Sequence, residues 1–364
     1  MTEAGHILST TDEVAMLRDS ARNLFAQEWP PERAVAASRD PAEIRRLLQQ
    51  MGRQGWLALG ADPESGGLRF AAVLLQELGR AGCPAPMVDA FLANVLFATA
   101  APGQAEVARL SDALHNGSAS ISLILGAHDG DANAGRISQS SNSGTTLLSG
   151  QAAFVEGTAT ATHLLASTDQ AGEFALVDAR HPQVRINETP GFIAPFLAEI
   201  ALDRVPATMI KTGMAETGDL ARIARLCLVA RSLGAVTRGF EMVVDYAKVR
   251  TQFGKKIGQF QAIQHKLANV MINVEVSKLA LWRAAGSYDR GDPDWRYAAG
   301  AAVSVASPAL RQACLETHHA FGGVSFWEEH EMPRHFRRIH ADLTRCGGVH
   351  GAREDVAQAL LDAA

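Results

Sequence analysis

The fold is decided by the stretch Tyr246-Ala-Lys-Val-Arg-Thr-Gln-Phe-Gly-Lys-Lys-Ile-Gly-Gln-Phe-Gln-Ala-Ile-Gln-His265, a short basic turn between two long helical patterns. Before it, apolar residues recur at helical spacing from about 220 to 249, and the same spacing returns from 263 to 281. So short a connection between two long helices favours an antiparallel pair. The stretch therefore predicts two packed helices with a candidate site at their turn.

This turn carries Arg250, Lys255 and Lys256 beside the aromatic ring of Phe253. Arginine pairs bidentately with phosphate, so cations next to an aromatic ring suit an anionic ligand with a flat ring, such as a nucleotide diphosphate. The residues alone are equally consistent with a solvated basic turn.

Length and composition narrow the class of protein. The chain has 364 residues, 47% of them hydrophobic and 20% charged, which predicts a globular protein of two or three subdomains. Its formal net charge of -5 disfavours nucleic-acid and membrane-surface partners, which usually attract a basic excess. No apolar run approaches the roughly 20 residues of a membrane span, and the first residues do not resemble a signal peptide. We expect a cytoplasmic protein.

The cysteines are too far apart in the sequence for a metal-type motif. Buried free thiols are the favoured interpretation of all four. They are Cys83, Cys227, Cys314 and Cys346.

Changes of pattern predict three domains. Residues 1–116 show helical spacing, with one helix starting near Thr11 and another capped by Asp40 before a proline. Residues 117–213 read as a small β domain, because short β-branched segments alternate with turn residues. Residues 214–364 return to helical spacing and are expected to form helices up to the end of the chain.

The β domain is predicted in more detail. Ser138–Gly144, rich in Ser, Asn and Gly, is expected to be a flexible hairpin tip. The candidate strands are Ala119–Leu125, Arg136–Gln139, Thr145–Leu148, Ala152–Val155, His163–Ser167, Phe174–Val177, Gln183–Ile186, Leu197–Leu202 and Ala207–Lys211.

The central stretch also carries a family resemblance. Its pattern Tyr-Ala-x-x-Arg-x-x-Phe-Gly-x-x-Ile-x-x-Phe-Gln-x-x-x-x-Lys-Leu-Ala resembles the signature of the acyl-CoA dehydrogenases, flavoenzymes that desaturate acyl-CoA thioesters between the α and β carbons. The resemblance implies an α+β fold with a helical domain, a central β domain and a C-terminal four-helix bundle. It also implies that Arg250, Phe253 and Gln261 reach an FAD held mainly by a neighbouring subunit.

A second motif lies in the segment His318–Phe326. Relatives carry a Gln before a Gly-Gly-x-Gly turn that approaches the ADP part of the flavin from the adjacent subunit. Here His319 holds the Gln place, Gly322 and Gly323 are kept, and Ser325 replaces the last glycine. Without the resemblance, a glycine helix cap is an equally good interpretation.

The β domain departs from the family. Relatives line the flavin ring with a Thr-Glu-Pro-x-Ala-Gly-Ser-Asp stretch and a Trp-Ile-Thr/Ser stretch, where this chain has Ile124–Asp131 and Phe154-Val-Glu156. Phe154 still offers an aromatic wall. Glu156 cannot donate as a hydroxyl does, and if ionised it would oppose the negative charge of reduced flavin. These departures leave open whether the chain binds FAD by itself.

Neither position of the family's catalytic glutamate holds an acid. The first corresponds to Cys346 and the second to Ala224, although Arg225, which the resemblance places on the substrate side, is retained. A thiolate of Cys346 is conceivable as a base, but an inert thiol is favoured because no activating partner is evident. We therefore assign no catalytic residue to this chain.

The resemblance implies a subunit that shares FAD with a second acyl-CoA dehydrogenase subunit, which carries the catalytic Glu, in an α2β2 assembly. The resemblance also implies an acyl-CoA substrate, with steroid side-chain esters among the candidates. The implied electron acceptor is of the electron-transfer flavoprotein type. Two alternatives stay open. One is a homotetrameric dehydrogenase with an unusual base, and the other is a non-redox acyl-CoA-binding or scaffold protein.

Overall fold

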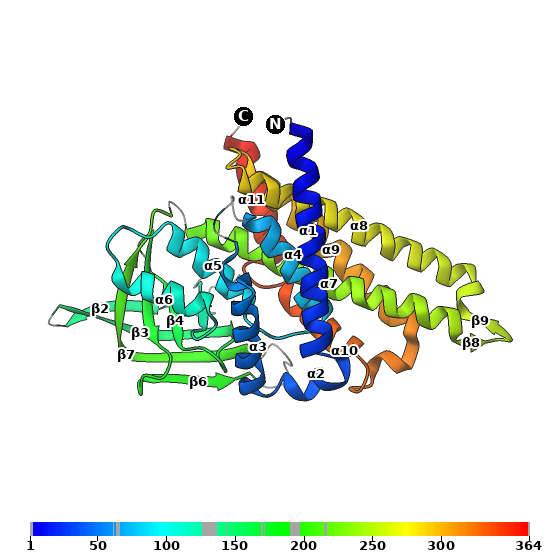
Figure 1. Cartoon of the computed structure of the whole chain (residues 1–364), viewed down its shortest axis with the longest axis horizontal. Coiled ribbons are helices and arrows are strands. Elements are labelled where there is room, and N and C mark those ends of the chain that lie inside the picture. Colours follow the sequence, from blue (N-terminus) through cyan, green and yellow to red (C-terminus); the bar gives the residue numbers. More distant parts are fainter. Residues whose placement is uncertain are drawn as a thin grey trace.

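The computed structural model describes residues 3–60, 62, 66–125, 137–142, 144–168, 170, 172–189, 197–214 and 217–362. Helices come first, a sheet follows, and long helices complete the chain (Figure 1). The sheet lies at one side of the molecule and the long C-terminal helices extend to the other. The predicted helix, sheet and helix order is confirmed.

The N-terminal helices are capped largely as their sequence predicts. The Asp40 carboxylate accepts the Ala42 N–H at 2.8 Å, with Pro41 as the first helical residue. The first helix begins at Glu3, so the expected start near Thr11 was too late. The elements are α1 (Glu3–Glu28), α2 (Pro31–Ala37), α3 (Pro41–Arg53), η1 (Trp56–Ala58), α4 (Gly67–Arg80), α5 (Met87–Ala98) and α6 (Ala105–His115).

The described strands form a sheet in the order β1-β4-β5-β7-β3-β2, with β6 also paired to β7. Only the β1–β4 pair among them is parallel. The strands are β1 (Ile121–Ile124), β2 (Ile137–Asn142), β3 (Thr145–Glu156), β4 (His163–Ser167), β5 (Glu173–Asp178), β6 (Val184–Glu188) and β7 (Leu197–Lys211).

Three predictions about these strands were wrong in detail. The two segments expected on either side of residue 150 are one strand, β3, whose pairing with β7 shifts register at two irregularities. The two segments expected between 197 and 211 are likewise one strand, β7. Irregularities break the alternation of side chains without ending a strand, so they imitate turns in the sequence. Ser138–Asn142, expected in a hairpin tip, belongs to β2.

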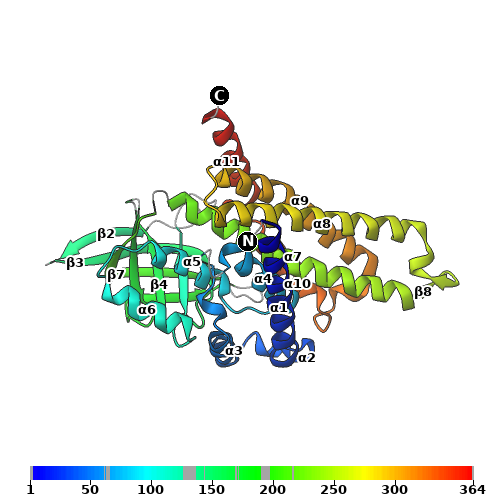
Figure 2. The same ribbon diagram turned by 45° about the horizontal axis from the view of Figure 1, so that its top comes forward.

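The C-terminal part is built on the predicted antiparallel pair, α7 and α8. Together with their connection they form an arm that projects away from the sheet (Figures 1 and 2). The elements are α7 (Thr217–Val249), β8 (Thr251–Gln252), β9 (Lys255–Lys256), η4 (Ile257–Gln259), α8 (Gln261–Asp289), α9 (Trp295–Phe321), η5 (Gly322–Phe326), α10 (Met332–Asp342) and α11 (Gly348–Asp362).

Small residues let α4 of the N-terminal part cross α7 closely. A Cβ on Gly79 would lie 1.9 Å from the carbonyl oxygen of Arg231, and one on Gly234 would lie 1.8 Å from that of Gln76. Both glycines are therefore required where the two backbones meet. This contact fixes the N-terminal helices on the C-terminal bundle.

Two further predictions concern burial. All four cysteines are buried, as expected, and none of them forms a disulfide with another described residue. Among the described residues, no helix combines the length and apolarity that a membrane span requires.

Candidate functional site

The basic turn lies at the outer end of the α7–α8 arm, away from the sheet (Figure 1). Arg250, directly after α7, is exposed, and so is Gln261, the first residue of α8. Phe253 is 92% exposed, and its φ of 52° lies in the left-handed region, which is rare for a bulky residue. The Phe260 ring supports it, with an edge-on contact to Phe253 at 6.2 Å and the Lys255 ammonium 4.3 Å from its centroid.

Phe253 contacts the Phe260 ring, but the side chains of Arg250 and Gln261 have no polar partner among the described residues. The Arg250 guanidinium forms no ion pair, and the Gln261 amide no hydrogen bond, with any residue that the structure describes. An exposed aromatic ring beside an unpaired guanidinium is available to another molecule. The tip therefore presents its polar and aromatic groups outward.

The second predicted segment lies against the first. The Tyr246 and Phe321 rings are 5.2 Å apart, in a small apolar cluster that joins α7 to the end of α9. On α8, the Lys266 ammonium contacts Nδ1 of His319 at 3.0 Å and also pairs with Glu316. An ammonium group only donates, so Nδ1 accepts and neutral His319 carries its proton on Nε2. His319 can therefore donate a hydrogen bond outward.

A cavity of about 640 Å³ opens beside this segment, between α9, η5 and α10. A Cβ on Gly322 or Gly323 would meet nothing within 4 Å, so the backbone is accessible there. The lining is mostly apolar, with Phe326 and Phe336 among its walls. The predicted His319, Gly322 and Gly323 thus lie together at one cavity, whose other lining residues are Leu315, His318, Ser325, Pro333 and Arg337.

His318 is a buried side chain in the wall of this cavity. Ser325 Oγ donates to the Gly322 carbonyl at 2.8 Å, so its 2.9 Å contact with His318 is a hydrogen bond donated by Nδ1. Burial lowers the pKa of His318, so the ring is neutral at pH 7. Its Nε2 atom, which has no hydrogen-bond partner among the described residues, is itself buried, so it does not open into the cavity.

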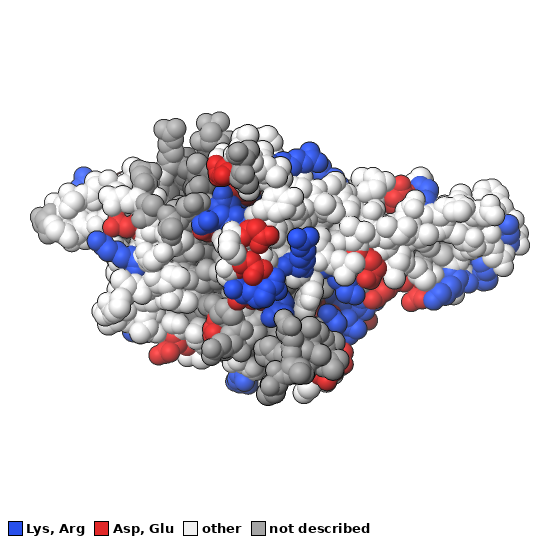
Figure 3. All heavy atoms as spheres, turned by 90° about the horizontal axis from the view of Figure 1, so that it is seen from above, with Lys and Arg blue, Asp and Glu red and all other residues white. Residues whose placement is uncertain are grey.

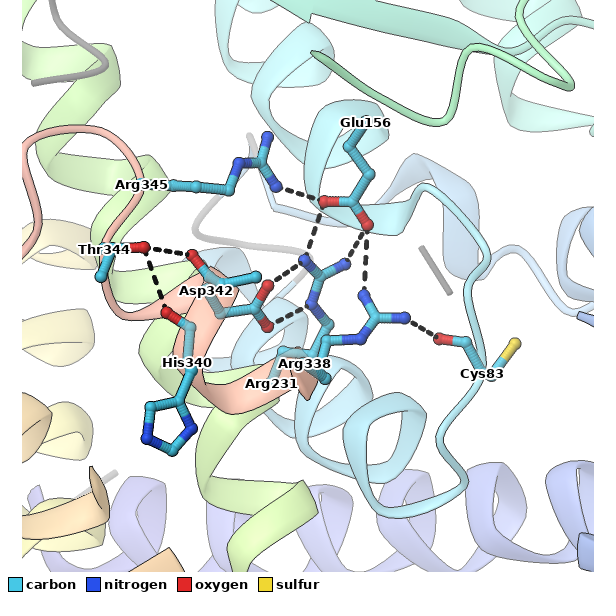
Figure 4. A network of polar contacts seen from close by, with 9 residues as sticks. Cys83, Glu156, Arg231, Arg338, His340, Asp342, Thr344 and Arg345 are labelled. Carbon is cyan, nitrogen blue, oxygen red and sulfur yellow. Dashed lines mark hydrogen bonds and ion pairs between the residues drawn. The ribbon is translucent and has the colours of Figure 1, made fainter. Parts of the chain in front are cut away.

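The structure also reveals a buried ion cluster between the sheet and the helices (Figure 4). Glu156, at the end of β3, is 1% exposed and accepts hydrogen bonds from Arg231 at 2.6 and 2.8 Å. Arg338 contributes another at 3.2 Å, and Arg345 also pairs with this carboxylate. Arg231 is fully buried and makes two further bonds to Asp342, at 2.8 and 2.7 Å.

This cluster changes the interpretation of Glu156. Burial alone would raise the pKa of Glu156, but the charges of Arg231, Arg345 and Arg338 outweigh burial and hold that pKa below its usual range. Glu156 is thus ionised, yet three arginines face only two carboxylates in the cluster. The expectation that its charge would oppose a reduced flavin is therefore corrected, because arginines more than neutralise it.

The charge of Glu156 in this cluster also affects Asp89 on α5. Its carboxylate accepts the Leu123 N–H at 3.3 Å. Burial and the charge of Glu156 raise the pKa of Asp89 to about 7. Asp89 therefore titrates near neutral pH.

The two positions of the family's glutamate lie on neighbouring elements. Cys346 follows α10, is 4% exposed and has a φ of 54°, while Ala224 is buried in α7. A Cβ on Gly347 would lie 3.8 Å from Arg225 Nη1, so the residue after Cys346 approaches the guanidinium of the residue after Ala224. Arg225 itself is ion-paired with Asp355 of α11. Neither position presents a carboxylate.

Sequence reasoning missed the arginines of the ion cluster. Arg231 stands within a run of α7 in which residues 223–235 are all buried. A charged residue inside such a run requires a buried counter-ion, so an arginine in this apolar run of the sequence could have indicated a buried ion pair. The counter-ions could not be named in advance, because Glu156 and Asp342 are 75 and 111 residues away in sequence.

The comparisons with known proteins agree with this fold. A model of the acyl-CoA dehydrogenase C-terminal domain matches residues 212–361, and one of the N-terminal domain matches residues 11–106. The chain belongs to the acyl-CoA dehydrogenase family, whose members are FAD-dependent oxidoreductases acting on acyl-CoA.

Similar proteins extend over almost the whole chain. Acyl-CoA dehydrogenase IpdE2 of Mycobacterium tuberculosis is 28% identical over 342 residues, 92% of each chain. A variant of the Tcur3481-Tcur3483 steroid ACAD superposes with a TM-score of 0.84 at 26% identity, over 97% of this chain and 99% of that one. The ChsE4-ChsE5 complex from Mycobacterium tuberculosis has a similar fold, with a TM-score of 0.81 at 23% identity over 100% and 98% of the chains.

Proposed function

We propose that this chain is the subunit of a heteromeric acyl-CoA dehydrogenase that completes the FAD site of a partner and supplies no catalytic base. One observation carries the proposal. Arg250, Phe253 and Gln261 project from the tip of an arm that points away from this chain's own β domain (Figure 2). A ligand at this tip has to be held largely by another subunit.

The residues present fit the ADP side of FAD. Arg250 would pair with the pyrophosphate, since a guanidinium matches phosphate oxygens with two parallel hydrogen bonds. The cavity at Gly322 and Gly323 would take the adenine, with His319 donating a hydrogen bond from Nε2. Aromatic walls favour a flat ring. When bound, FAD supplies the acceptor for the hydride that leaves the β carbon.

Proton abstraction is assigned to the partner. Desaturation requires a base within hydrogen-bond reach of the α proton of the thioester. This chain has Cys346 and Ala224 at the two places where its family carries that glutamate, and both are buried. The partner subunit therefore supplies the carboxylate, and the electron acceptor is expected to be an electron-transfer flavoprotein.

The names of similar proteins support the substrate class and the assembly. The Tcur3481-Tcur3483 protein is a steroid ACAD named for two chains, and it is 26% identical to this one. We infer a bulky, steroid-derived acyl-CoA as substrate and an α2β2 assembly with two kinds of subunit.

The test is to purify the chain alone and together with a second acyl-CoA dehydrogenase subunit that carries the catalytic glutamate. We expect the chain alone to lack flavin absorbance and desaturase activity with acyl-CoA esters, and the complex to have both. Desaturation by the pure chain at ordinary rates of roughly 1–10³ s⁻¹ would support the homotetrameric alternative instead. Binding of acyl-CoA without flavin in either sample would support the non-redox alternative.

A further inference from the structure

A chain of four hydrogen-bonded side chains connects α9 to α8 and ends at the cavity proposed for the adenine. The two helices pack side by side (Figures 1 and 2). On α9, Gln312 Nε2 donates to Glu316 Oε1 at 2.9 Å, and Glu316 Oε2 accepts from the ammonium of Lys266 on α8 at 2.5 Å. The ammonium also donates to Nδ1 of His319 at 3.0 Å. His319 ends the chain and lines the cavity.

This arrangement holds the Lys266 ammonium in place. The side chains of Lys266 and Glu316 are 31% and 25% exposed, so the ion pair is partly shielded from water. The hydrogen bond from Lys266 lowers the pKa of Glu316, so the carboxylate is ionised at pH 7. A hydrogen bond between two ionised groups is stronger than one between neutral groups. Glu316 therefore keeps the ammonium where it meets the His319 ring.

The ammonium decides which hydrogen bond His319 can make. A neutral imidazole has one donor and one acceptor, and its proton can sit on either nitrogen. Because an ammonium group only donates, Nδ1 of His319 has to be the acceptor and Nε2 carries the proton. Within the described part of the chain, Nε2–H has no acceptor. Without Lys266, the ring would be free to exchange its donor and acceptor or to become charged.

Other polar side chains of the same wall are already engaged. His318 donates from Nδ1 to Ser325, and Ser325 donates to a backbone carbonyl. Arg337 is bound to Glu328 through two hydrogen bonds of 2.8 Å. His319 is therefore the neutral side chain of this wall, among the described lining residues, with a donor left free.

We propose that Lys266 and Glu316 are positioning residues that fix His319 as a hydrogen-bond donor to the ligand of this cavity. The inference rests on the proposed function, in which that ligand is the adenine of FAD. An unprotonated ring nitrogen of adenine is an acceptor and would receive the bond from Nε2. A ring edge that has only donors would leave Nε2–H unpaired, so the arrangement selects for an acceptor edge.

The first experiment reads the His319 tautomer in the full-length chain labelled with [15N]histidine, since the ring-nitrogen chemical shifts distinguish protonated from unprotonated atoms. His319→Ala identifies the signals. We expect unprotonated Nδ1 and protonated Nε2 in the wild type and in Lys266→Arg, because a guanidinium also only donates. In Lys266→Met both signals should move toward averaged values. Protonated Nδ1 in the wild type, or unchanged signals in Lys266→Met, would overturn the inference.

The second experiment measures FAD affinity of the complex by flavin absorbance. Loss of one positioned hydrogen bond predicts that Lys266→Met weakens FAD binding about twofold to tenfold, and that Lys266→Arg restores it. Lys278→Met is the matched control and should change nothing, since Lys278 is another lysine of α8 and pairs with Glu275 at 3.6 Å. In a His319→Ala background, Lys266→Met should have no further effect.

The outcomes separate this inference from the proposed function. Additive effects of Lys266→Met and His319→Ala would show that Lys266 acts without His319 and would overturn its positioning role. FAD affinity that falls in Arg250→Ala but not in Lys266→Met would also overturn that role, while the proposed function would stand. A complex that binds no FAD would refute both.

Discussion

Replacing Glu156 with glutamine tests the buried ion cluster most directly. The side chain keeps its size but loses the charge that faces Arg231, Arg338 and Arg345, leaving three arginines with Asp342 as their carboxylate partner in the cluster. Removing one partner of a buried ion pair typically costs about 3–5 kcal/mol, because the remaining charge is left uncompensated. We expect a loss of unfolding free energy in this range.

The assay is urea unfolding, followed by circular dichroism, of the protein in its purified assembly. Glu106→Gln is the matched control, since Glu106 pairs with the exposed Arg109 at the surface and should change stability little. Adding Arg345→Gln to Glu156→Gln should cost less than the sum of the two single changes, because the two side chains interact. A loss below about 1 kcal/mol for Glu156→Gln would refute the role of the cluster.

The same variant has a defined pH dependence. The pKa of Glu156 is below its usual range in the folded chain, so its contribution is present above the unfolded value of about 4.5 and is lost as pH falls below it. The stability difference between wild type and Glu156→Gln should therefore narrow under acidic conditions. A difference that stays constant on acidification would contradict this assignment.

Three other predictions follow from the site. Arg250→Ala should weaken FAD retention by the complex roughly tenfold to a hundredfold without unfolding the subunit, measured by flavin absorbance after gel filtration with Arg53→Ala as control. Cys346→Glu alone, supplied with FAD and acyl-CoA esters, should not transfer electrons to an artificial acceptor, since a base without a positioned flavin is insufficient; robust activity would show a complete site in this subunit. The pKa of Asp89 is about 7, so the folded chain holds a proton that the unfolded chain has lost, and stability falls as pH rises from about 4 to 7. Asp89→Asn should remove this fall and stabilise the chain at pH 8 by a few kcal/mol, and an unchanged pH profile of urea unfolding would count against it.

The sequence by itself determined the order of the elements and the helix pair. The apolar spacing on both sides of the turn required two long helices, and Asp40-Pro41 marked a helix start that the structure has at the same place. These features are local, because helical spacing and capping depend on residues within a few positions of one another. The same local signals misplaced strand boundaries in β3 and β7, where irregularities imitate turns.

Only the tertiary structure decided which side chains meet. Arg231 was missed in the sequence, and its carboxylates come from β3 and α10, to which no local pattern points. The contact of Lys266 with His319 likewise joins residues 53 positions apart, and the cavity beside Gly322 forms only where α9, η5 and α10 pack together. Ion pairs and cavities depend on the distance between elements after packing, whereas secondary structure depends on neighbours along the chain. For this reason the sequence indicated the two segments that we propose to bind flavin, and the fold alone revealed the buried charges.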